Sequence, residues 1–100
     1  MVEATVALSP NGLALEVTGV LDVQTVPGLV GKANGFIHEV ADPVFDLAGV
    51  TKAESSALAL LMAWHRQSHG LGKAARFVHV PKNLMAIATL SNLESVLKLG

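Results

Sequence analysis

The sequence has no cysteine and few charged residues, and both shortages narrow the classes of protein it can belong to. Without cysteine there is no disulfide, no thiolate chemistry and no cysteine-ligated zinc. Charged residues make up 15% of the chain, against about 25% in an average soluble domain. Such a chain is either very compact or has part of its surface covered by a partner protein, and we favour a covered surface.

Several functions are excluded by other absences. The net charge of −1 leaves no basic surface for nucleic acid. The longest unbroken apolar run, Ala57–Trp64, is far too short to cross a bilayer, and the N-terminus does not resemble a signal peptide. No glycine-rich loop is followed by a lysine, so a P-loop is not expected. We therefore expect one cytoplasmic domain over residues 1–100, with no cofactor and no membrane span.

The most informative stretch is a strand, a turn and a helix. Val44–Leu47 has apolar residues on both faces, which predicts a buried strand, and Ala48–Ala53 is expected to turn. Thr51 and Glu54 have the spacing of a capping box, so a helix should begin directly afterwards. Gly70 is a natural residue to end that helix.

The predicted helix has one apolar face and one face of small residues. Its apolar arc, which should pack on the sheet, contains Ala57, Leu58, Leu60, Leu61, Met62, Trp64 and His65. The opposite arc would be charged if it faced water. Instead it contains Ser56, Ala59, Ala63, Arg66 and Gln67, a composition that favours docking against another protein.

The N-terminal part predicts a hairpin followed by a glycine-interrupted helix. Residues 4–8 and 13–18 flank an Asn-Gly turn, with Leu13, Leu15 and Val17 expected to point inward. Thr25 can cap a helix that runs to about Glu39. Its apolar face should contain Val26, Leu29, Val30, Ala33, Phe36 and Ile37, opposite Gly28, Gly31 and Gly35. These glycines indicate either an irregular helix or a groove that another backbone approaches.

The C-terminal part predicts one more strand and one more helix. The strand should cover Ala75–Val80 and the helix Asn83–Leu90, with Asn83 as its N-cap and Asn92 as its C-cap. A last helical turn is expected over Ser95–Leu99. The predicted order is β-β-α-β-α-β-α, an α/β fold with a small mixed sheet and packed helices.

Three segments together resemble the STAS family, to which the anti-sigma-factor antagonists belong. They are Gly19-Val20-Leu21-Asp22, Asp46-Leu47-Ala48-Gly49-Val50 and Glu54-Ser55-Ser56-Ala57-Leu58. Residues 57–61 and 90–93 are most similar to the MlaB branch of the family, which serves bacterial phospholipid-transporting ABC complexes. Glu54 stands where the family usually has aspartate, and Ala57 where it usually has glycine.

The resemblance implies a non-catalytic protein with a protein partner. In an MlaB-like role the chain would bind the transporter ATPase at the inner face of the inner membrane and support outer-membrane lipid asymmetry. The alternative is an anti-sigma-factor antagonist whose partner is an anti-sigma-factor kinase and whose Ser55 is phosphorylated. The residues expected to bind the partner are Glu54, Ser55, Ser56, Ala59, Ala63, Arg66, Gly28 and Gly31.

Other chemistry has weaker support in the sequence. Ser55 and Ser56 can instead serve only to cap the helix, through hydroxyls that accept from first-turn N–H groups. His65 and His69 are one helical turn apart, a spacing that can hold a metal, but only His79 could supply a third ligand, so we expect no metal site. No general base is placed near either serine, so we expect no enzyme activity.

Overall fold

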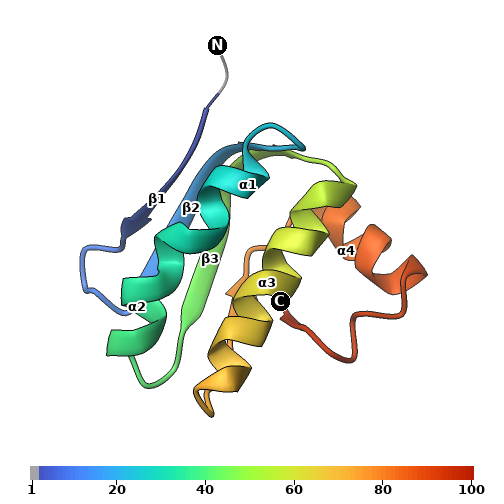
Figure 1. Ribbon diagram of the computed structural model, residues 1–100. Helices are drawn as coiled ribbons and strands as arrows, with labels where there is room; N and C mark the ends of the chain where they lie inside the picture. Colours follow the sequence, from blue (N-terminus) through green and yellow to red (C-terminus); the bar gives the residue numbers. More distant parts are fainter. Residues whose placement is uncertain (1–2) are drawn as a thin grey trace.

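The computed structural model describes residues 3–100, and its elements alternate much as the sequence predicts. Figure 1 shows helices packed against a central sheet. In chain order the elements are β1 (Ala4–Leu8), β2 (Ala14–Leu21), α1 (Val26–Leu29), the 3₁₀ helix η1 (Val30–Ala33), α2 (Asn34–Glu39), β3 (Val44–Ala53), α3 (Ser55–Gly70), β4 (Arg76–Val78), α4 (Lys82–Leu90) and β5 (Lys98–Leu99). Within residues 3–100, no helix has the length and apolar character that a membrane crossing requires.

The sheet is mixed, as predicted. Its strand order is β1-β2-β3-β4-β5, in which β1 pairs antiparallel with β2 and every other neighbouring pair is parallel. The helical turn predicted over Ser95–Leu99 lies about two residues earlier, where the Leu97 N–H donates to the Leu93 carbonyl at 2.9 Å. The last two residues of the predicted turn instead form strand β5. Its two residues pair with Arg76 and Phe77, and the Gly100 N–H donates to the Phe77 carbonyl at 2.8 Å.

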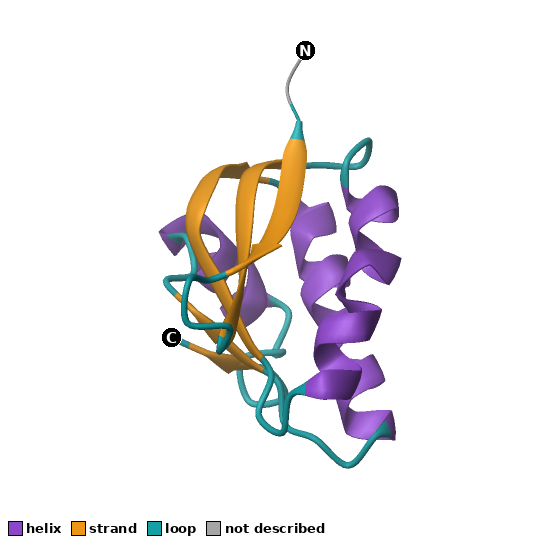
Figure 2. Cartoon of the chain, turned by 90° about the vertical axis from the view of Figure 1, so that its left-hand side faces the viewer, coloured by secondary structure: helices purple, strands orange, loops and turns teal. Residues whose placement is uncertain are grey.

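The core lies between the sheet and the helices. Figures 1 and 2 show α1, η1 and α2 forming one column of helix beside α3. Phe45 from β3 stacks on Trp64 from α3 with ring centroids 4.7 Å apart, and on Phe77 from β4 at 5.2 Å. Phe36 from α2 meets the Phe45 ring edge-on. One aromatic residue of the central strand therefore joins three other elements.

The helix predicted over residues 25–39 is divided into α1, η1 and α2. Its predicted apolar face is correct, because Val26, Leu29, Ala33, Phe36 and Ile37 are buried and Val30 is half-buried. The glycines face outward, and a Cβ added at any of them would meet nothing within 4 Å. The irregular-helix interpretation is therefore confirmed, and no backbone within residues 3–100 fills a groove there.

Strand β3 is longer than predicted. Residues 48–53, expected to turn, continue the strand and pair with the second half of β2, where Thr18 lies opposite Gly49 and Leu21 opposite Ala53. The register shifts twice along this pairing, which lets the strand pass an irregular stretch without ending. Leu13 is 66% exposed and does not point inward as predicted, because it precedes β2.

The helix ends also differ from the predictions. Gly70 is the last residue of α3, and Gly72 takes the left-handed position beyond it with φ +73°. The Gly72 and Lys73 N–H groups donate to the His69 and Ser68 carbonyls at 2.9 Å, which is a Schellman motif. Asn92 plays the equivalent role after α4, with φ +57°, one residue beyond the C-cap Ser91.

Thr25 is the N-cap residue of α1, as predicted, but neither its side chain nor that of Asn83 caps a helix, because each bonds to another part of the chain. Thr25 forms no side-chain cap bond; its hydroxyl donates to the Val20 carbonyl at 2.7 Å, and the Asp22 carboxylate accepts from the Thr25 N–H at 3.0 Å. Asn83 lies inside α4, whose N-cap is Pro81.

Candidate functional site

The N-terminus of α3 is held in place by two other elements. Glu54 is its N-cap residue and has an extended backbone, with φ −104° and ψ 178°. The Glu54 N–H donates to the carbonyl of Leu21 at the end of β2, at 2.9 Å. The Asn83 side-chain amide, from α4, donates to the Ala53 carbonyl at 2.6 Å. The position of the first turn of α3 is therefore fixed by hydrogen bonds to β2 and from α4.

The capping box predicted for this helix is absent. Thr51 lies within β3, and Glu54 makes no side-chain cap hydrogen bond. The Ser56 hydroxyl is buried without a hydrogen-bond partner, and across residues 3–100 the Ser55 hydroxyl also forms none. The extension of β3 explains the error, because it places Thr51 too far back to reach the helix. Neither serine therefore caps α3 in the way predicted.

Ser55 is the more accessible of the two serines. It is the first residue of α3 and is exposed, whereas Ser56 is only partly exposed. The N–H groups of the first helical turn lie beside it, with the positive end of the helix dipole. A negatively charged group on Ser55 would thus be compatible with the fold.

The residues predicted to bind a partner lie on neighbouring elements. Ala59 and Arg66 are exposed on α3 together with Glu54 and Ser55, while Ala63 is partly exposed. Gly28 on α1 and Gly31 on η1 are exposed, and the column that carries them lies beside α3 in Figure 1. We call this set of residues the docking face: Glu54, Ser55, Ser56, Ala59, Ala63, Arg66, Gly28 and Gly31.

Two hydrogen bonds join the two parts of the docking face. The Trp64 indole N–H donates to the Val30 carbonyl at 3.1 Å, and the Gln67 side-chain amide donates to the same oxygen at 3.3 Å. Val30 is the first residue of η1 and directly precedes Gly31. Because Trp64 is fully buried, the contact fixes the glycine-bearing segment against α3.

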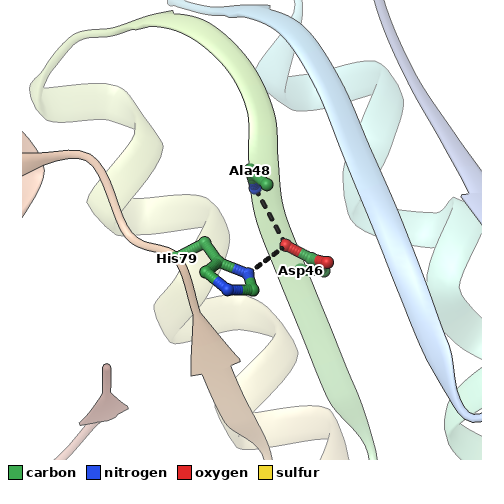
Figure 3. Close-up of polar contacts among 3 residues, drawn as sticks. All are labelled: Asp46, Ala48 and His79. Carbon is green, nitrogen blue, oxygen red and sulfur yellow. Dashed lines mark hydrogen bonds and ion pairs between the residues drawn. The ribbon is translucent and has the colours of Figure 1, made fainter.

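A second polar arrangement, which the sequence analysis missed, joins β3 to the end of β4. His79 Nδ1 lies 2.8 Å from Asp46 Oδ1, and the same oxygen accepts from the Ala48 N–H at 2.9 Å. Figure 3 shows both contacts. Burial acts to raise the pKa of Asp46, but the Ala48 N–H and the contact with His79 outweigh it and bring that pKa below its ordinary value of 3.8. Asp46 lies opposite Val78 in the parallel pairing, which brings His79 within reach.

The histidines do not assemble into a metal site. His65 and His69 stack on each other with ring centroids 6.0 Å apart, while His79 pairs with Asp46. Over residues 3–100 no group of three or more potential metal ligands is found. The idea that His79 could complete a site with the two α3 histidines is therefore wrong.

Comparison with known proteins supports the family that the sequence resembles. A family model described as "Mlab, STAS domain" matches residues 4–99. No curated protein sequence matches the chain significantly. Among solved structures, an anti-sigma factor antagonist from Mycobacterium paratuberculosis has 22% sequence identity and a TM-score of 0.74, over 99% of this chain and 85% of that one.

Two further structures show the same fold at lower identity. Unphosphorylated SpoIIAA, an anti-sigma factor antagonist, has 13% identity and a TM-score of 0.70, over 97% of this chain and 87% of that one. Phosphorylated SpoIIAA from Bacillus also has 13% identity, with a TM-score of 0.67, over 97% of this chain and 90% of that one. At this level of identity the structures establish a shared fold, and the match to the family model establishes membership. The chain belongs to the MlaB family of STAS domains.

Proposed function

We propose that this chain is a non-catalytic subunit that binds the cytoplasmic ATPase of a phospholipid-transporting ABC complex through the docking face. The observation that carries the proposal is the exposed line of small residues on α3. Ala59 is exposed and Ala63 partly exposed, one turn apart, beside a column whose Gly28 and Gly31 have no side chains. Such a surface lets a partner helix approach closely, and it has little charge to keep it in water.

Membership of the MlaB family supports the choice of partner. In proteins of this branch the STAS domain serves a lipid transporter, and its partner is the ATPase. The low content of charged residues, 15%, is also consistent with a surface that stays covered in a permanent complex. A partner that must detach regularly would need a face that is stable in water.

The test is to place a charged side chain in the middle of the docking face. Ala59→Glu and Ala63→Glu should leave the fold intact yet abolish co-purification with the transporter ATPase, since each adds bulk and charge where the partner must approach. Ala86→Glu is the matched control, because Ala86 is an exposed helical alanine on α4, outside the docking face. If both α3 variants co-purify as well as the control, the ATPase does not bind here.

A second candidate function is an anti-sigma-factor antagonist that a kinase switches at Ser55. Its support is specific: Ser55 is exposed at the helix start, and its hydroxyl is free of hydrogen bonds within residues 3–100. Phosphate there would add nearly two negative charges beside the helix N-terminus, which the fold tolerates. At a packed interface the same charges would require desolvation and weaken binding.

Three forms of residue 55 separate the two functions. If the chain is a permanent subunit, protein purified from its host carries no phosphate, Ser55→Ala retains binding to the ATPase and Ser55→Asp loses it. If it is a switch, intact-mass spectrometry finds phosphate on part of the protein, and the phosphate maps to Ser55. Equal binding by the wild type and both variants would remove Ser55 from either mechanism.

A further inference from the structure

One edge of the sheet is open. Strand β1 is the outermost strand, and nothing within residues 3–100 pairs on its outer side. The Ser9 N–H donates to the Ala14 carbonyl at 2.9 Å, so alternate residues from Ser9 backwards face β2. The backbone N–H and C=O groups of Ala4, Val6 and Leu8 therefore point away from the sheet.

This edge lacks the devices that usually prevent strand pairing. Residues 4–8 contain no charged residue and no proline, both of which commonly protect exposed edges. The opposite edge is protected, because β5 has only two residues and one of them is Lys98. Of the two edges, β1 alone offers a length of backbone that another strand could join.

An exposed leucine and a hollow lie at the two ends of this edge. Leu8, at the end of β1, is 58% exposed. A hollow of about 320 Å³ lies beside the start of the strand, where Gly28 contributes no side chain. Ala4 and Val6 pack against the core, and by strand alternation Leu8 lies on the same face of the sheet. The hollow is lined by Glu3, Ala4, Thr5, Thr25, Gly28, Leu29 and Lys32.

We propose that this chain pairs with a second copy of itself through antiparallel β1 edges, about a twofold axis at Val6. In this register Ala4 lies opposite Leu8 of the second copy, and the outward backbone groups of both strands meet. The side chain of each Leu8 then lies over the small Ala4 of the other copy and enters the hollow beside it. The strand therefore carries both halves of a self-complementary contact, as a twofold interface requires.

A register nearer the hairpin turn fits less well. Moving the pairing toward the hairpin turn would bring Pro10 into the ladder, and proline has no N–H to donate. In the proposed register no two like charges lie opposite each other, since Glu3 meets Ser9 and Thr5 meets Ala7. Because a pair of short strands buries less than the roughly 1,200 Å² of a standard interface, we expect a weak, reversible dimer.

Sedimentation velocity from about 10 μM to about 1 mM protein tests the proposal. The wild type should shift from monomer to dimer across this range, and Leu8→Ser should weaken the dimer by about tenfold or more. Leu13→Ser is the matched control, since Leu13 is comparably exposed but lies outside β1, and it should not change the dimer. A wild type that stays monomeric at every concentration would overturn the proposal and leave the edge for an extended segment of another protein.

A charge test checks the register itself. In Thr5→Lys/Ala7→Lys two lysines face each other across the axis, so the dimer should be lost, whereas Thr5→Lys/Ala7→Glu pairs opposite charges and should keep it. Both variants lose the 2.7 Å contact between the Thr5 and Thr18 hydroxyls, so any effect of that loss is the same in both. Equal dimerisation of the two variants would contradict the register. Gly28 belongs both to the docking face and to the hollow, so the separating variant is Ala63→Glu, which lies on α3 away from the β1 contact and should dimerise like the wild type.

Discussion

Gly19→Ala should destabilise the protein more than any other glycine-to-alanine change. Gly12→Ala provides a control in the same chain. Gly19 lies in β2 opposite Ala4 and has φ +99°. A Cβ there would overlap the Glu3 carbonyl oxygen and would lie 2.9 Å from the Ala4 Cα, so it meets backbone atoms and not a side chain that could rotate away. Either β1 must shift or β2 must bend.

The magnitude follows from two additive costs. An alanine in the left-handed region costs about 1–2 kcal/mol relative to its usual conformation. Forcing extra volume into a packed position costs about 1–3 kcal/mol more. Gly19→Ala should therefore lower the free energy of unfolding by about 2–5 kcal/mol, a large fraction of the roughly 5–15 kcal/mol typical of a domain.

Gly12→Ala isolates the conformational cost. Gly12 has φ +72° in the β1–β2 turn, but a Cβ there would meet nothing within 4 Å. Gly12→Ala should therefore lower the free energy of unfolding by only about 1–2 kcal/mol. Urea denaturation of both variants, fitted with a common m-value, gives the difference directly. If Gly12→Ala and Gly19→Ala cost the same, the overlap with β1 is not real and the antiparallel pairing of these strands is looser than described.

Two further predictions concern the core and the polar pair outside it. Leu61→Ala should lower the free energy of unfolding by about 2–5 kcal/mol in urea denaturation, because Leu61 is 0% exposed. As a control, Leu90→Ala, at a residue 84% exposed, should change it by less than about 0.5 kcal/mol. A cost below about 1 kcal/mol for Leu61→Ala would mean that Leu61 is not in the core. The pKa of Asp46 is lower in the folded state than its ordinary 3.8, so its contribution to stability is present above that pH and is lost as pH falls through the folded-state value. The stability difference between wild type and His79→Ala should accordingly shrink below about pH 3.8. A difference that stays constant down to the acid transition would show that the ionised Asp46 carboxylate is not the source of the contribution.

The parts of the fold that sequence predicts well are those where burial has a clear period. The inward positions Leu15 and Val17 of β2, and Leu58 and Leu61 of α3, follow the strand and helix periods and are buried. Residues 48–53 misled the prediction because Gly49 is a common turn residue and Lys52 is polar, yet the backbone of both pairs with β2. Pairing over a distance in sequence overrides local preference there. A strand as short as β5 has no period to detect.

The candidate site likewise has features that the sequence predicts and features that it does not. The helix that carries Ser55, and the exposure of Ala59 and Arg66, follow from helical period and are found where predicted. The Asp46–His79 pair could not be found, because the two residues meet only through the parallel alignment of β3 with β4. The capping box failed for the opposite reason: a local motif was present in the sequence, but the longer strand separated its members.

The way in which the docking face is held bears on which proposed function it serves. Its α3 part is fixed at the helix start by bonds from Glu54 to β2 and from Asn83 to β3. Its glycine part is fixed by Trp64 and Gln67, which both donate to the Val30 carbonyl. A surface whose parts are already held together loses little conformational entropy when a partner binds, so more of the contact energy appears as affinity. That arrangement suits the lasting association that the proposed subunit function requires. A phosphate on Ser55 would then act by adding charge at the edge of the interface.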